Sequence, residues 1–130
     1  MDHGRIAIRE EDREWETWNE GEAPRKGQAY WKTLISRGVT RSENLTLGVA
    51  TLPPGGAMRE HRHVQEEVYL VLEGSGLVRV EDEELSVEAG TAVFIPGGLR
   101  SCENTGASDL RVAYVFAADS FDEVEYDFEV

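Results

Sequence analysis

Two of the chain's three histidines, His61 and His63, stand two positions apart, and a carboxylate follows at Glu67. Alternate residues of a β-strand share a face, so the two imidazoles point the same way. Glu67 has the same parity and joins them if the chain stays extended or bends gently. Two imidazoles and a carboxylate suit Fe, Mn, Ni or Zn with open positions, and such an ion polarises a carbonyl or activates water. Two surface histidines, or two hydrogen-bonded core histidines, would give the same pattern.

Short β-strands must position these residues. Residues 1–28 form a polar, charge-rich N-terminal arm, and from about residue 30 the hydrophobic period becomes two. Runs rich in β-branched and aromatic residues are separated by Gly, Pro, Asn, Asp and Ser, as in an all-β sandwich or barrel. We therefore expect one domain of 29–130 behind the arm, with strands in YWKTLIS, NLTLGVATL, EVYLVLEG, GLVRVED, ELSVEAG, TAVFIPGG and LRVAYVFA.

The two chain ends carry further patterns. Trp15 and Trp18 are three residues apart, so they would share one face of a helical turn and pin the arm onto the barrel or a second subunit. The tail DEVEYDFEV alternates, with Val124, Tyr126, Phe128 and Val130 on one face. We interpret it as a final strand whose acidic stripe faces solvent.

The run VYLVL at 68–72 is apolar on both faces. A strand of this kind is buried on both sides. In a chain this short the second cover must come from another sheet, the arm or a partner subunit, which favours a homodimer with twofold symmetry.

At this point the sequence resembles the cupin superfamily. Its first motif, G(X)5HXH(X)3-4E(X)6G, is matched at Gly55, His61, His63, Glu67 and Gly74. The second motif, G(X)5PXG(X)2H(X)3N, is matched at Gly90, Pro96 and Gly98. The resemblance covers roughly residues 44–117 and implies a jelly-roll β-barrel (a double-stranded β-helix) with a metal inside, bound by His61, His63 and Glu67.

The second motif then departs from the family pattern. Ser101 stands where the family has a third metal-binding histidine, and the Asn arrives one residue early, at Asn104. Counting back from Asn104 puts Arg100 in the ligand position instead. Three alternatives stay open for the fourth position or for a substrate contact: Ser101, a carboxylate from Glu103, or Arg100 holding an acidic substrate. A one-residue slip of register would offer the Cys102 thiolate.

The resemblance implies a metal-dependent enzyme acting on a small organic molecule inside the barrel, as a dioxygenase, isomerase, decarboxylase or lyase. Glu67 would move a proton, and Tyr69 would either hydrogen-bond the ligand or cap the core. The alternative is a non-catalytic cupin that binds or senses a small ligand with a degenerate metal site. The fold does not choose between these functions.

Composition excludes some partners. A formal net charge of −13 disfavours nucleic acid and anionic membrane surfaces. The single cysteine, Cys102, allows no internal disulfide, and we find no signal-peptide or membrane-spanning run. We expect a cytoplasmic protein. The histidines are committed to one strand, so a Ser-His-Asp triad is not supported, and a phosphate-binding G-x-x-x-x-G-K-[ST] motif is absent.

Overall fold

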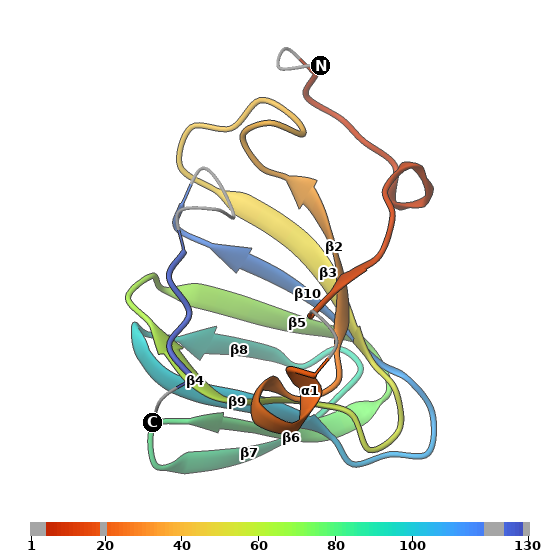
Figure 1. Ribbon diagram of the computed structural model, residues 1–130, viewed down its shortest axis with the longest axis vertical. Helices are drawn as coiled ribbons and strands as arrows, with labels where there is room; N and C mark the ends of the chain where they lie inside the picture. The colour runs from red at the N-terminus through yellow and green to blue at the C-terminus, as the bar shows by residue number, and fades with distance from the viewer. Residues whose placement is uncertain (1–4, 19–20, 119–123, 129–130) are drawn as a thin grey trace.

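A computed structural model of the chain describes residues 5–18, 21–118 and 124–128 and contains two antiparallel β-sheets that face each other (Figure 1). The predicted all-β jelly-roll barrel is confirmed. The described elements are a 3₁₀ turn η1 (Glu10–Asp12), β1 (Glu16–Thr17), α1 (Ala23–Lys26), β2 (Tyr30–Ile35), β3 (Thr46–Leu52), β4 (Ala57–His63), β5 (Glu67–Glu73), β6 (Ser75–Val80), β7 (Glu83–Glu88), β8 (Ala92–Ile95), β9 (Gly98–Asn104) and β10 (Leu110–Phe116).

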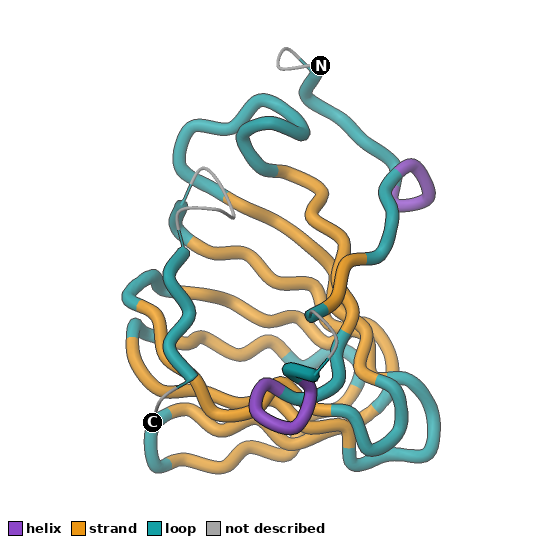
Figure 2. The backbone as a smooth tube through the Cα atoms, in the orientation of Figure 1, coloured by secondary structure: helices purple, strands orange, loops and turns teal. Residues whose placement is uncertain are grey.

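The strand order divides the site between two layers. One sheet runs β1-β2-β3-β10-β5-β8 and the other β4-β9-β6-β7. Figure 2 shows that strands make up both layers and that the short helical turns belong to the N-terminal segment. The histidine strand β4 and the strand β5 that begins at Glu67 therefore lie in opposite sheets, joined by residues 64–66. No helix among the described residues is long and apolar enough to cross a membrane.

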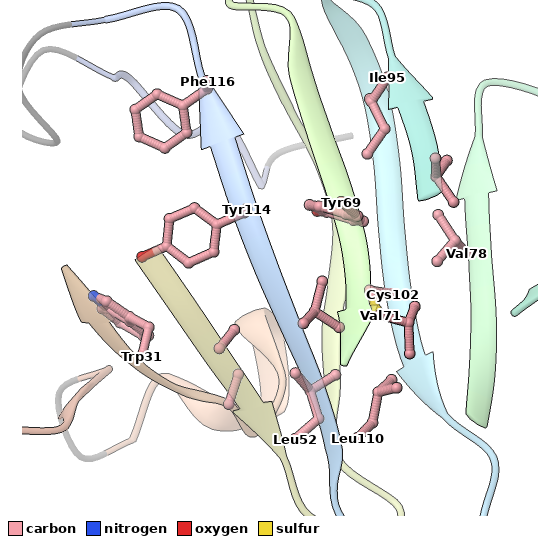
Figure 3. Close-up of a cluster of buried hydrophobic side chains, with 14 of the residues drawn as sticks. Trp31, Leu52, Tyr69, Val71, Val78, Ile95, Cys102, Leu110, Tyr114 and Phe116 are labelled. Carbon is pink, nitrogen blue, oxygen red and sulfur yellow. The ribbon is translucent and has the colours of Figure 1, made fainter. Parts of the chain in front are cut away.

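The core lies between the sheets and is built by alternation. In β5 and β10 every second side chain is buried, and these residues meet those of β6 and β9 (Figure 3). The shared inner layer contains Leu52, Tyr69, Val71, Val78, Ile95, Cys102, Leu110, Val112, Tyr114 and Phe116. Burial of this layer is the main stabilising contribution to the fold, since each large apolar side chain contributes about 1.5–3 kcal/mol.

The arm is attached to the barrel by a short strand and an aromatic contact. β1 pairs antiparallel with β2, and the Trp18 ring packs on Trp31 with centroids 4.6 Å apart. Trp15 and Trp18 flank β1 rather than a helical turn, so the predicted shared helical face is wrong. Trp18 nevertheless pins the arm, as expected.

The tail lies beside β4 without forming a strand. The backbone N–H groups of Arg62 and Asp127 each donate to the other's carbonyl, at 2.8 and 2.9 Å, as an isolated bridge. The prediction of a final strand is wrong for residues 124–128, and Glu123, Glu129 and Val130 lie outside the described residues. The alternation itself holds, since Val124 is buried and Glu125 and Asp127 are exposed.

The outer face of β5 is more exposed than predicted. Val68, Leu70 and Leu72 are 42, 42 and 44% exposed, and Phe94, which pairs with Val68, is 61% exposed. Within the described residues neither sheet nor arm covers this face. We call Val68, Leu70, Leu72 and Phe94 the outer apolar patch.

The structure explains why a glycine ends the first motif. Gly74 adopts φ +86°, and a Cβ there would collide with the Asp109 carbonyl. We expect Gly74→Ala to lower the free energy of unfolding by about 2–3 kcal/mol, because left-handed strain adds to a backbone clash. Gly90→Ala is the control, because Gly90 has a similar φ of +93° but no atom lies within 4 Å of the Cβ that alanine would add. We expect this variant to lower the free energy of unfolding by only about 1 kcal/mol, from the left-handed strain alone. Urea unfolding measures both, and equal losses would contradict the clash.

Candidate functional site

His61 is a buried, oriented imidazole. It is 1% exposed on β4, where its neighbours Glu60 and Arg62 face solvent. Its Nδ1 lies 2.7 Å from the Arg59 carbonyl oxygen, so Nδ1–H donates and Nε2 keeps a free lone pair. Burial, chiefly, lowers the pKa of His61 to about 4, with the nearby positive charge of Arg100 acting in the same direction. The ring is therefore neutral at pH 7.

The Glu67 side chain projects from β5 in one sheet toward His63 on β4 in the other. It opens β5 and is 5% exposed, and its Oε1 lies 3.4 Å from His63 Nε2. The convergence predicted from residue parity is therefore real for His63 and Glu67, but the turn at 64–66 produces it rather than one extended strand.

Arg100 lies at the centre of this group. It is fully buried on β9, where it pairs with His61, and its Nη1 contacts His63 Nε2 and lies 3.5 Å from Glu67 Oε1. Its Nη2 donates to the Pro96 carbonyl at 2.7 Å. A guanidinium only donates, so His63 accepts through Nε2 and carries its proton on Nδ1.

The register of β9 decides among the alternatives that the sequence left open. Arg100, Cys102 and Asn104 face inward, whereas Ser101 is half-buried and Glu103 exposed on the other face. Asn104 holds this register, since its Nδ2 donates to the Leu52 and Ser108 carbonyls at 2.8 and 2.9 Å. Arg100 is therefore the residue that meets the histidines, and Ser101 and Glu103 face away from them.

Cys102 faces the core opposite Met58, one step along β9 from the Arg100–His61 pair. It is 4% exposed, and burial raises the pKa of its thiol to about 12. A thiolate ligand from a slipped register does not match this placement.

The described donors do not fit a metal ion as they are arranged. No group of three His, Cys, Asp or Glu side chains within residues 5–18, 21–118 and 124–128 is disposed to hold one. His63 Nε2 and Glu67 Oε1, 3.4 Å apart, are both in contact with Arg100 Nη1. A metal ion at this place would have to displace a buried guanidinium.

A small apolar cavity adjoins the cluster. Its volume is about 40 Å³, against the roughly 10–15 Å³ that holds one water. Its polar walls are His61 and Glu67. The other lining residues are Trp18, Trp31, Ala50, Leu52, Met58, Tyr69, Cys102, Val112, Tyr114 and Tyr126.

The tyrosines of the cavity are all held protonated. Burial, and secondarily the Glu67 carboxylate, raises the pKa of Tyr69 and of Tyr126 well above the usual value. Burial likewise raises the pKa of Tyr114, against the opposing effect of a side-chain hydrogen bond with Thr33. These hydroxyls can donate to a bound molecule, but they are not bases at neutral pH.

Sequence reasoning missed the aromatic wall at the chain ends. The Tyr126 ring centroid lies 5.6 Å from that of His61 and 5.1 Å from that of His63. The Phe128 ring centroid lies 5.0 Å from that of His61. Phe128 also meets Trp18 at 5.5 Å. Alternation in the sequence predicted an apolar face for the tail, but it did not show that this face packs against the two histidines.

The chain is a two-sheet β-barrel that encloses two buried histidines and a glutamate. This arrangement places it among the small barrel proteins whose site lies between the sheets. The chain belongs to the cupin domain family, whose Cupin_2 model matches residues 48–116.

Individual relatives share the fold but differ in their named activities. The chain is 40% identical over 108 residues to the dimethylsulfoniopropionate lyase DddW of Ruegeria pomeroyi, which covers 83% of this chain and 71% of that protein. It is 31% identical to an oxalate-binding protein of Thermotoga maritima, over 66% of this chain and 73% of the relative. The polyketide cyclase RemF from Streptomyces resistomycificus superposes with a TM-score of 0.76 at 21% identity, over 94 and 83% of the two chains.

Proposed function

We propose that this cupin is a lyase whose barrel takes a small compound bearing a methylated sulfonium or ammonium group. The supporting observation is the cavity, in which a buried carboxylate, Glu67, is combined with the aromatic rings of Trp18, Trp31, Tyr69, Tyr114 and Tyr126. Aromatic faces attract desolvated onium cations, and the rings supply this attraction because the Glu67 charge is already compensated by Arg100. The 40% identical relative is named for dimethylsulfoniopropionate, which carries a dimethylsulfonium group and a carboxylate.

The elimination uses two residues of the chain. A base removes a proton from the carbon next to the substrate carboxylate, the electron pair forms a carbon–carbon double bond, and the carbon–sulfur bond breaks to release the sulfide. Glu67 is the carboxylate that lines the cavity, and it accepts the proton. Tyr69, protonated at neutral pH, donates a hydrogen bond to the substrate.

A metal-dependent version is the second candidate. The observation that favours it is the His61 Nδ1–Arg59 hydrogen bond, since it leaves Nε2 available to a ligand. His61, His63 and Glu67 would then hold a divalent Fe, Mn, Ni or Zn ion, which supplies Lewis-acid catalysis. This version requires Arg100 to leave its place between His63 and Glu67.

Sulfide release tests the proposed reaction. Purified protein is incubated with dimethylsulfoniopropionate, dimethyl sulfide is measured in the headspace, and binding is measured separately by calorimetry. We expect turnover that is lost in Glu67→Gln and reduced in Tyr69→Phe. Binding without turnover supports the non-catalytic alternative. If the compound neither binds nor reacts, the proposal is wrong.

We further propose that the protein is a homodimer joined through the outer apolar patch. The four patch residues come from adjacent strands, and two copies of the same face can cover each other around a twofold axis. Light scattering after gel filtration should give twice the chain mass of 14.5 kDa. Phe94→Glu should give the single-chain mass, whereas Leu45→Glu, at an exposed apolar residue outside the patch, should not. A monomeric wild type contradicts this proposal.

A further inference from the structure

The cation at the centre of the histidine cluster belongs to the chain itself. Arg100 has no exposed surface, and its Nη1 meets both His63 Nε2 and Glu67 Oε1. These are two of the atoms that would otherwise coordinate an ion. A guanidinium does not lose its proton in proteins, so a positive charge is always present here.

The position of Arg100 is built into the strands. β9 pairs with β4 so that Arg100 faces His61, and Nη2 is held by the Pro96 carbonyl at 2.7 Å. The Asn104 side chain, bonded to the Leu52 and Ser108 carbonyls, fixes the register four residues further along. The guanidinium cannot swing to solvent without disturbing this part of β9.

Electrostatics opposes a second cation in the same place. Glu67 is the carboxylate that contacts Arg100, and one carboxylate compensates one guanidinium. A divalent ion placed between His63 and Glu67 would leave two uncompensated positive charges beside Arg100 in a buried environment. Buried charge without a partner is strongly unfavourable.

We infer that Arg100 takes the place of a metal ion in this barrel, and that the residue at position 100 determines whether the site binds metal. His61 and His63 are then hydrogen-bonding groups of a metal-free site. The inference is independent of the proposed lyase reaction, since it concerns only what occupies the cluster.

Changing Arg100 to a ligand tests the inference directly. Arg100→His removes the guanidinium and adds a third imidazole opposite His61. Each variant is purified without added metal, analysed for bound metals, and titrated with Zn²⁺, Mn²⁺, Ni²⁺ and anaerobic Fe²⁺ by calorimetry. Arg100→Gln serves as the matched variant that removes the charge without adding an imidazole, and urea unfolding shows which variants fold.

We expect wild type to bind no stoichiometric metal and Arg100→His to bind one ion about 100-fold more tightly or better. Arg100→Gln should fall between them, because two donors, His63 Nε2 and Glu67 Oε1, are freed beside His61 Nε2. Adding His61→Ala to Arg100→His should abolish the gain. Near-stoichiometric metal in wild type that is lost in His61→Ala overturns the inference. So does a folded Arg100→His that binds metal no better than wild type; if Arg100→His does not fold, the wild-type and Arg100→Gln measurements decide.

Discussion

Replacing Glu67 with Gln should lower the free energy of unfolding by about 3–5 kcal/mol, the largest stability change we expect. Glu67 and Arg100 are 5 and 0% exposed, with Oε1 and Nη1 3.5 Å apart. The amide is nearly the same size as the carboxylate, so packing is preserved. The loss comes from a guanidinium that stays buried with no carboxylate to compensate it.

A double-mutant cycle separates this charge effect from a packing effect. In Glu67→Gln with Arg100→Met both charges are gone, so stability should return to within about 1 kcal/mol of wild type. Glu84→Gln is the surface control, because the Arg79–Glu84 pair is about half exposed at 2.8 Å and should contribute less than about 0.5 kcal/mol. Urea unfolding followed by tryptophan fluorescence measures all of these. Additive losses in the double variant would contradict the coupling.

The sequence was sufficient to predict the barrel and the placement of His61 and His63 on one face of a strand. Alternation with period two identified the strands, and residue parity placed His61 and His63 on one face. Both rest on local geometry that holds in any strand. The apolar residues on both faces of β5 were also visible, but a sequence does not say whether the second face is covered, and Leu70 and Phe94 are exposed.

The identity of the residue beside the histidines was not predictable. Ser101 and Arg100 differ by one position, and a one-residue shift of register exchanges the two faces of a strand. The hydrogen bonds of Asn104 decide for Arg100, and one of them goes to the Leu52 carbonyl, 52 residues away in the chain. The places of Tyr126 and Trp18 in the cavity wall were not predictable for a similar reason, because their contacts join chain ends to a barrel wall made from residues between them.

Those two aromatic residues give the prediction with the largest expected effect on binding. Tyr126→Ala should weaken the binding of dimethylsulfoniopropionate by about five- to thirtyfold, since a desolvated cation–π contact contributes about 1–2 kcal/mol. Tyr126 lines the cavity and stands 5.1 Å from the His63 ring, so its removal opens the wall beside Glu67. Trp18→Ala should have a comparable effect from the arm.

A neutral analogue distinguishes attraction to the positive charge from loss of packing. 4-Methylpentanoate has the shape of dimethylsulfoniopropionate with a carbon in place of the sulfonium, so it retains the apolar contacts and lacks the cation. Wild type should prefer the sulfonium compound by about tenfold or more in calorimetric titrations, and Tyr126→Ala should reduce that preference. Trp15→Ala, at a 45% exposed ring that does not line the cavity, should leave both affinities unchanged. Equal affinities of wild type for the two compounds would contradict recognition of the onium charge by this aromatic wall.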